Sequence, residues 1–218
     1  MSETVLHYSI IGGGGFGAEI AGYLGDINKN KKYICKIWDN FFNHQAFRNV
    51  NCIYAGNIEN IKTVQSEVVL ICIGNCERRA QIADFLKRRN IRLGRFIHPS
   101  SIVSSSAKIQ DGCIILPYTS VSVDAEVGYN SVLNSHVAIG HHAKIGDHCV
   151  ISPQTLVAGN AVIGDECFLG AGVMITPGKK IGKLSKISAG SVVYRNAQSG
   201  AFLLGNPAKN FSKRAADE

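Results

Sequence analysis

Three of the chain's seven histidines fall within the twelve residues AIGHHAKIGDHC, at positions 138–149. Histidine serves as a metal ligand, or as a proton acceptor near neutral pH because its unperturbed pKa is about 6.5. A metal site needs three or four converging ligands. A catalytic base needs a single imidazole within reach of its substrate. A histidine that only lies on the surface needs neither arrangement. Which of these three roles applies depends on the secondary-structure elements that hold the residues.

A six-residue repeat determines where these histidines lie. Every sixth residue from Val103 to Val193 is Val, Ile or Leu, sixteen times in succession. Four residues after most of these positions comes a small residue, such as Ala143 or Cys149. A hexapeptide repeat of this kind is typical of a parallel β-helix. Three hexapeptides complete one triangular coil, so we expect residues 18 apart to stack.

The repeat separates the three histidines. His142 and His148 are one hexapeptide apart and therefore belong to different faces of the coil. His141 and His142 are adjacent in an extended segment, so their side chains point in opposite directions. We therefore expect no metal site. Gly159 stacks one coil after His141, and we expect an open notch beside the imidazole.

Residues 1–98 follow a different pattern, in which short apolar runs alternate with helical segments. A continuous aliphatic run such as VVLICIG is typical of a buried parallel strand. Strands are expected at 7–11, 33–39, 68–74 and 91–97, and helices at 18–27 and 77–89. Such alternation predicts right-handed βαβ units on a parallel sheet. We expect an α/β Rossmann-like domain over residues 1–98 and an all-β parallel β-helix over residues 99–218.

The stretch GGGGFG follows the first expected strand and precedes the first expected helix. Gly12, Gly14 and Gly17 match G-x-G-x-x-G, whose glycines let the backbone approach a phosphate at a helix N-terminus. Asp39 ends the second expected strand, where a carboxylate can accept a ribose hydroxyl hydrogen bond. The residues before the repeat leave no room for the second half of a dinucleotide site. We expect a nucleotide diphosphate-sugar there; the alternative is a turn without a ligand.

Composition narrows the remaining classes. The 218 residues carry a net charge of +7, with basic residues spread along the chain and a single Trp, which favours phosphate-bearing small molecules over nucleic acid. No apolar run reaches the length of a bilayer span, and MSETVLHYSII lacks the basic start of a signal peptide. Seven cysteines with scattered spacing fit reduced thiols in a cytoplasm. Cys149 and Cys167 are expected to stack as small corner residues without a disulfide.

The hexapeptide run resembles the left-handed β-helix acyltransferases, which use acetyl-CoA and usually work as trimers. Together with SIIGGGGFGAEI, IGN-x4-R, FIHPSS and GNPAK, the whole chain resembles bacterial nucleotide-sugar acetyltransferases. These enzymes N-acetylate 4-amino-4,6-dideoxyhexoses for surface glycans such as lipopolysaccharide or capsule. The resemblance implies a homotrimer with active sites between subunits, a cytoplasmic location and no metal. We favour dTDP over UDP or GDP as the nucleotide. Sialic acid O-acetyltransferases share the layout, and a non-catalytic solenoid binding protein is a further alternative.

The resemblance also implies a set of site residues. His141 would be the catalytic base and Asn134 a neutral hydrogen-bonding partner to it or to the substrate. The residues implied for the nucleotide-sugar are Gly12, Gly14, Phe16, Gly17, Asp39, Asn40, Asn75 and Arg79. Those implied for acetyl-CoA are His142, Gly159, Ala171, Ala189, Pro207 and Lys209. The basic residues Lys179, Lys180, Lys183, Lys186, Arg195, Lys209, Lys213 and Arg214 fit either the CoA phosphates or a solvated face.

Two positions depart from the family pattern. Relatives often have a histidine at the position of Phe16 and an acid at the position of His142. What orients His141 is therefore open, and Asp124, one coil before His142, is a candidate for the missing charge.

Overall fold

The computed structural model describes residues 5–64 and 66–212. It divides into two compact units, one formed by residues up to Gly74 together with Arg78–Arg95, the other by Asn75–Glu77 together with residues from Phe96 onward. Within the described ranges, no helix has the length and apolar character needed to cross a membrane.

The N-terminal unit contains a four-stranded parallel sheet in the order β3-β2-β1-β4. Its strands are β1 (Leu6–Ile11), β2 (Tyr33–Trp38), β3 (Ile53–Gly56) and β4 (Val68–Ile71). Its helices are α1 (Gly15–Ile27), α2 (Cys76–Arg88) and the 3-10 turn η1 (Ile58–Asn60). The aliphatic strand residues Ile10, Ile11, Leu70 and Ile71 are fully buried, as expected for a parallel sheet covered by helices. The expected Rossmann-like βα arrangement is confirmed.

The sequence-based boundaries fail at two places in this region. Strand β3 was not expected, because Ile53 and Tyr54 are exposed and give no apolar run at this edge of the sheet. Residues 91–97 were expected to form a strand of the N-terminal sheet. Only Phe96–Ile97 is a strand, β5, and it pairs in parallel with β8 (Ile114–Ile115), 18 residues further on. The β-helix therefore begins one hexapeptide before the aliphatic repeat.

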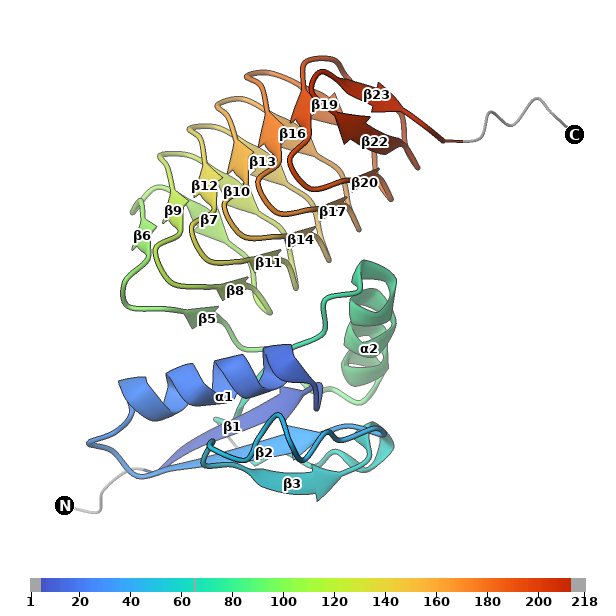
Figure 1. Cartoon of the computed structure of the whole chain (residues 1–218). Coiled ribbons are helices and arrows are strands. Elements are labelled where there is room, and N and C mark those ends of the chain that lie inside the picture. Colours follow the sequence, from blue (N-terminus) through green and yellow to red (C-terminus); the bar gives the residue numbers. More distant parts are fainter. Residues whose placement is uncertain (1–4, 65, 213–218) are drawn as a thin grey trace, which may run out of the picture. The chain divides into compact units, whose positions relative to one another are not determined.

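The second unit is a parallel β-helix of stacked triangular coils (Figure 1). Its two-residue strands recur every six residues. Those not yet given are β6 (Ile102–Val103), β7 (Lys108–Ile109), β9 (Ser120–Val121), β10 (Glu126–Val127), β11 (Val132–Leu133), β12 (Ala138–Ile139), β13 (Lys144–Ile145), β14 (Val150–Ile151), β15 (Leu156–Val157), β16 (Val162–Ile163), β17 (Phe168–Leu169), β18 (Met174–Ile175), β19 (Lys180–Ile181), β20 (Lys186–Ile187) and β21 (Val192–Val193). A short antiparallel pair, β22 (Phe202–Gly205) and β23 (Ala208–Asn210), follows the last coil.

The strands form three faces. The first face contains β7, β10, β13, β16 and β19; the second runs from β5 through β8, β11, β14, β17 and β20 to the β22–β23 pair; the third contains β6, β9, β12, β15, β18 and β21. Within a face, residues 18 apart pair in parallel, as with Ala138 and Leu156. The repeated aliphatic residue is the second residue of each strand, and from Val121 to Val193 it is buried in one continuous core. The parallel β-helix is confirmed, and its left-handed winding stays a prediction.

The corners between faces share one backbone feature. From position 112 to 190, every sixth residue has a positive φ. Four of these residues are glycine; the others include Asp124, Asn130, His136, His142 and His148, with φ between 54° and 61°. The left-handed region is most accessible to Gly, Asn, Asp and His. The histidine-rich stretch thus owes His142 and His148 to the corner geometry, whereas His141 lies one position earlier.

The residue after each of these positive-φ positions is buried, except Lys179 after Gly178, and most of these residues are small. Cys149 and Cys167 are free, buried thiols in consecutive coils of one corner, as expected. Each Sγ donates to a carbonyl oxygen fifteen residues ahead, at 3.1 Å for Cys149 and 3.2 Å for Cys167. The hydrogen bond with Cys167, and then burial, raise the pKa of the Cys149 thiol. We therefore expect this thiol to react slowly with alkylating reagents in the folded chain.

Two adjacent residues of β13 test the inward and outward positions of the coil. Replacing Ile145, which is 3% exposed, with Ala should lower the free energy of unfolding by about 2–5 kcal/mol, because the change leaves a cavity in the core. Replacing the exposed Lys144 with Ala should cost no more than about 1 kcal/mol, the value of a surface ion pair. Urea unfolding of both variants measures the difference. Equal losses would contradict the register assigned to this strand.

Candidate functional site

His141 lies on the corner that follows the third face, which we call the His141 corner. It consists of residues 104–107, 122–125, 140–143, 158–161, 176–179 and 194–197 in successive coils. His141 is exposed there, and its carbonyl oxygen accepts a hydrogen bond from Asn160 N, at 2.9 Å. The imidazole therefore sits on a backbone that the next coil holds in place.

Gly159 makes room for the His141 ring. A Cβ at Gly159 would lie 2.6 Å from Nε2 and 2.7 Å from Cε1 of His141. The three atoms nearest to that position all belong to the imidazole. The stacking expected from the repeat is present, but the ring itself occupies the space that we expected as an open notch. Any residue larger than glycine at position 159 would have to displace the ring.

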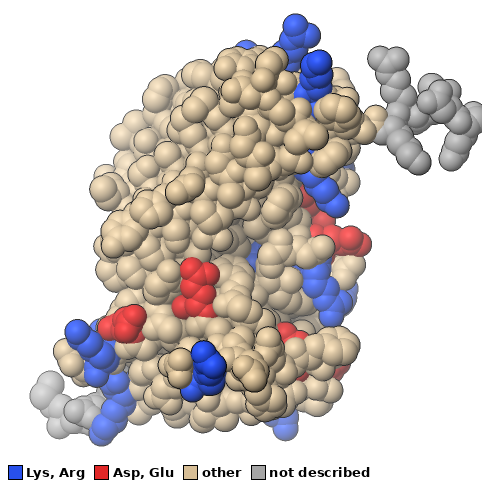
Figure 2. All heavy atoms as spheres, viewed as in Figure 1, with Lys and Arg blue, Asp and Glu red and all other residues tan. Residues whose placement is uncertain are grey.

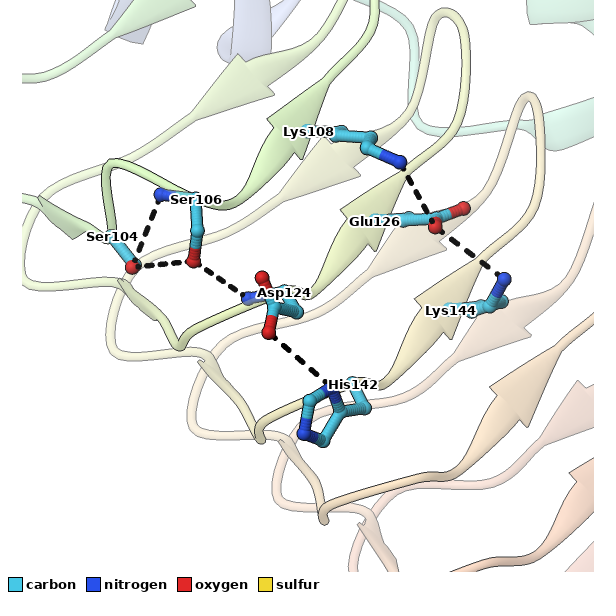
Figure 3. Close-up of polar contacts among 7 residues, drawn as sticks. All are labelled: Ser104, Ser106, Lys108, Asp124, Glu126, His142 and Lys144. Carbon is cyan, nitrogen blue, oxygen red and sulfur yellow. Dashed lines mark hydrogen bonds and ion pairs between the residues drawn. The ribbon is translucent and has the colours of Figure 1, made fainter.

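His142 connects His141 to the preceding coil. Its ring centroid lies 5.3 Å from that of His141, with the planes at 84°. On its other side, His142 Nδ1 is 3.6 Å from Asp124 Oδ2 (Figure 3). His148 is on another corner, where its Nδ1 is 2.9 Å from the side-chain nitrogen of Asn130. The three clustered histidines therefore have three different surroundings, and His148 is half-buried.

Asn134 lies on a different corner, the one that precedes the third face. This Asn134 corner consists of residues 116–119, 134–137, 152–155, 170–173 and 188–191. The Asn134 side-chain oxygen accepts a hydrogen bond from Ser135 N, at 2.7 Å. Ala171 and Ala189 are exposed on the same corner, one coil apart. One chain thus places Asn134, Ala171 and Ala189 at one edge of the third face and His141 at the other.

The third face itself is largely apolar on its outer side. Because the second residue of each strand points inward, the first residue of each strand faces outward. The outward residues are Ile102, Ser120, Ala138, Leu156, Met174 and Val192. Ile102 is 75% exposed and Met174 is 41% exposed. The face between the two corners has the character of a protein contact surface.

A cavity of about 450 Å³ lies where the His141 corner meets the C-terminal pair of strands. Its lining includes Tyr194, Arg195, Pro207 and Lys209. Sequence reasoning placed Pro207 and Lys209 along acetyl-CoA and offered Arg195 to either the CoA phosphates or a solvated face, but it gave Tyr194 no role. The repeat adds a further signal, because Arg195 is three coils of 18 residues after His141. One coil rises by the spacing between paired strands, so three coils span about 14 Å.

Basic side chains gather toward this end of the coils. In the view of Figure 2, much of the coil surface carries no charged side chain, and Lys and Arg appear near the C-terminal coils. Lys180, Lys183 and Lys186 are exposed, and Lys179 is half-buried. Lys213 and Arg214, which the sequence suggested for the same role, lie outside the described residues.

The glycine loop of the N-terminal unit adopts a conformation that needs its glycines. Gly12 has φ +126°, and a Cβ on it would collide with the Cys72 carbonyl. A Cβ on Gly17 would collide with the Gly12 carbonyl, so α1 approaches the loop closely. Gly14 is exposed at the start of α1, with open space around it, while Phe16 is half-buried. The exposed backbone at the α1 N-terminus is able to receive an anion.

Asp39 and Asn40 already have partners in the loop that follows β2. Asp39 accepts hydrogen bonds from Gly13 N, at 2.5 Å, and from Phe41 N, at 2.7 Å. Asn40 donates to Glu59 Oε1, at 2.8 Å. This hydrogen bond from Asn40 lowers the pKa of Glu59. Asp39 thus ties the end of β2 to the glycine loop, and a ligand would have to share it.

Asn75 and Arg79 differ from each other in exposure. Asn75 is exposed just before α2 and groups with the β-helix unit. Arg79 is fully buried in the N-terminal unit, and its Nη1 donates to the carbonyls of Ile71, at 2.5 Å, and Ile73, at 3.1 Å. Those carbonyls end β4, so the guanidinium supports the loop after the strand and is not turned to solvent.

A metal has no evident site. Across residues 5–64 and 66–212, no group of three or more His, Cys, Asp or Glu side chains is arranged to hold a metal ion. The His141 corner presents the exposed imidazole of His141 and, beside it, His142 with the neighbouring Asp124 carboxylate.

Comparison with known families defines the class of fold. The hexapeptide repeat of succinyl-transferases matches residues 160–195. Residues 160–195 thus match the repeat of the hexapeptide transferases, and the expected solenoid of hexapeptide coils is confirmed.

Solved structures extend the likeness to the whole chain. A histidine-to-asparagine mutant of perosamine N-acetyltransferase from Caulobacter crescentus, in complex with CoA and GDP-perosamine, has a TM-score of 0.83 at 22% identity, covering 98% of this chain and 100% of its own. WeeI from Acinetobacter baumannii AYE has a TM-score of 0.82 at 20% identity, covering 95% and 100%. The acetyltransferase domain of PglB from Neisseria gonorrhoeae, in complex with acetyl coenzyme A, has a TM-score of 0.70 at 24% identity, covering 95% and 100%.

These likenesses are of fold, since all three identities are below 25%. The chain has the fold of these solved structures, and the resemblance inferred from its motifs is confirmed at that level.

The contact between Gly159 and His141 can be tested without knowledge of a substrate. Gly159→Ala should displace the His141 ring, because the three atoms nearest to the added methyl all belong to the imidazole, and should leave the melting temperature nearly unchanged. Gly128→Ala is the matched control, since its Cβ would meet the backbone of Gly146 at 2.5–2.6 Å. The control should lower the melting temperature by about 2–10 °C. NMR shifts of the imidazole carbons and thermal unfolding read both effects, and an unmoved ring in Gly159→Ala would contradict the geometry.

Proposed function

We propose that the protein is an acetyl-CoA-dependent N-acetyltransferase acting on the 4-amino group of a nucleotide-linked 4-amino-4,6-dideoxyhexose. The observation that carries the proposal is the exposed His141 imidazole seated on Gly159, three coils from a cavity containing Arg195 and Lys209. A base at one end of a corner and cations at the other match a thioester linked to a phosphorylated nucleotide. The bound ligands of the solved neighbours, CoA with GDP-perosamine and acetyl coenzyme A, support the same assignment.

The reaction is direct transfer between two bound substrates. The sugar amine attacks the thioester carbonyl, forming a nitrogen–carbon bond and a tetrahedral oxyanion. Collapse of that intermediate breaks the carbon–sulfur bond and expels the CoA thiolate. His141 accepts the proton that the nitrogen loses and returns it to the sulfur. Such general-base catalysis is typically worth about 10²–10⁴-fold, and the remaining acceleration comes from positioning the two substrates.

Acetyl-CoA lies along the His141 corner in this proposal. The thioester sits at the exposed side of His141, because Gly159 and the ring fill the space between the coils. The pantetheine arm follows the corner toward Pro207, and Arg195 and Lys209 meet the phosphates. His142 borders the acetyl end of this path, next to His141.

The N-terminal unit is proposed to bind the nucleotide. The exposed amides at Gly14 receive the diphosphate, Gly12 and Gly17 set the turn, and Phe16 borders it. Asp39, which already anchors Gly13, is placed at the end of β2 to share a hydrogen bond with the ribose. Our sequence-based preference for dTDP over UDP or GDP stays a prediction. We also propose that the enzyme is cytoplasmic and serves surface-glycan synthesis.

Asn40, Asn75 and Arg79 receive narrower roles. Asn40 holds Glu59 through its amide and would contact the nucleotide only through its exposed surface. Asn75 is exposed just before α2, and we propose that its side chain contacts a polar group of the nucleotide-sugar. Arg79 is proposed to act indirectly, by fixing the carbonyls after β4.

A homotrimer is proposed because one chain splits the predicted site residues between two corners. His141 and Gly159 are at one edge of the apolar third face, and Ala171 and Ala189 are at the other. A single acetyl-CoA can touch both sets when the second edge comes from a neighbouring copy. Head-to-tail contacts around a three-fold axis supply this arrangement and cover the exposed Ile102 and Met174.

The activity is tested with acetyl-CoA and a panel of dTDP-, UDP- and GDP-linked 4-amino-4,6-dideoxyhexoses, with release of free thiol as the signal. His141→Ala should lower kcat by about 10²–10⁴-fold while the Kd for acetyl-CoA stays within about threefold, because a base contributes to the transition state alone. His148→Ala, a histidine on another corner, is the control. An unchanged kcat in His141→Ala would refute the base. Transfer only to a sialic acid hydroxyl, or to no acceptor, would favour the two alternative functions.

The shared site is tested by mixing two inactive chains. His141→Ala lacks the base, and Ala189→Trp should block acetyl-CoA with a bulky ring at an exposed position. If each site joins two copies, co-expression should restore activity at about one quarter of the sites, as random assortment in a closed ring predicts. If each site lies within one chain, no mixed oligomer regains activity. Activity no higher than that of the separate variants would therefore contradict the trimer proposal.

A further inference from the structure

The corner beside His141 contains a polar chain that runs through three successive coils. The Ser106 hydroxyl lies 3.3 Å from the Ser104 hydroxyl and accepts a hydrogen bond from Asp124 N, at 3.0 Å. Asp124 Oδ2 then lies 3.6 Å from His142 Nδ1 (Figure 3). The chain ends at His142, whose ring meets the His141 ring edge to face.

The β-helix holds the last two members of this polar chain, Asp124 and His142, in register. Asp124 and His142 are 18 residues apart and hold the same corner position, with φ of 55° and 57°. The amide of His142 donates to Val123 O, at 3.0 Å, so a backbone hydrogen bond joins the two coils at this corner. The side chains are half exposed, at 57% for Asp124 and 53% for His142. Their approach is thus set by the coil and not by a long flexible arm.

The other nearby charges are engaged among themselves. Glu126 Oε1 lies 3.7 Å from Lys108 Nζ and 3.4 Å from Lys144 Nζ, on the first face (Figure 3). Of the two described carboxylates in these contacts, Asp124 and Glu126, it is Asp124 that lies beside His142. The imidazole of His142 is therefore bordered by Asp124 in the coil before and by His141 in its own coil.

Resting on the function proposed above, we propose that Asp124, acting through His142, is a positioning residue for His141. The carboxylate favours the hydrogen of His142 on Nδ1, which fixes the tautomer and the ring plane. The ring so held limits the rotation of His141, which Gly159 borders in the following coil. Asp124 touches neither substrate in this account and affects the reaction through the orientation of the base alone.

The kinetic test compares two acids of one coil. Asp124→Asn should lower kcat by about two- to fivefold, because a polar contact between two half-exposed side chains is weak, and should leave KM for both substrates within twofold. Glu126→Gln, whose carboxylate faces two lysines, is the matched control and should leave kcat unchanged. Asp124→Glu should recover part of the loss. Equal kcat values in wild type and Asp124→Asn, or equal losses in Asp124→Asn and Glu126→Gln, would overturn the proposal.

A second measurement does not depend on the reaction. In ¹⁵N NMR spectra of the full chain without substrates, His142 should show the Nδ1–H tautomer, and Asp124→Asn should lose that preference. Glu126→Gln should retain it. A wild-type chain inactive on every acceptor would refute the proposed function, while these spectra would still decide the Asp124–His142 contact. A His142 signal that does not change in Asp124→Asn would overturn the positioning role whatever the activity.

Discussion

The structure depends on one constraint, the pairing of residues 18 apart. Each coil of the β-helix is only two residues wide on each face, so no strand is stable on its own. The parallel hydrogen bonds to the coils before and after, and the aliphatic column inside, hold each pair in place. Any residue at a corner therefore has a fixed neighbour one coil away. His141 over Gly159 and Asp124 beside His142 are both products of this register.

The same constraint explains how much the sequence could predict. The sixteen aliphatic positions determined the core, the faces and the stacking of Gly159 with His141. The corner residues were also recoverable, because Asp, Asn, His and Gly recur at the positions with positive φ. What the repeat could not give is the direction of a side chain at the surface. The Gly159 space is filled by the imidazole, which follows from a rotamer and not from the spacing.

The N-terminal unit was less predictable for a related reason. Its strands pair with neighbours distant in sequence, so no sequence repeat predicts their pairing. The exposed edge strand β3 gave no apolar pattern, and Phe96–Ile97 looked like part of the first sheet although its 18-residue partner lies in the β-helix. Arg79 in the loop motif resembled a ligand-binding cation, yet its guanidinium is buried on backbone carbonyls. Residue type alone does not show whether an arginine is buried or exposed, because burial depends on packing in the folded chain.

The regular coil also fixes distances along the axis of the β-helix. The separation between His141 and the cavity at Arg195 comes in whole coils, each adding about 4.8 Å along the axis. No substitution at the surface changes that spacing, because the core column fixes the rise. In the proposed function, the number of coils between His141 and Arg195 therefore sets the length of acyl carrier that fits, while the N-terminal unit selects the sugar. Cofactor length and acceptor identity are then set by separate parts of the chain, and either is free to change without disturbing the other.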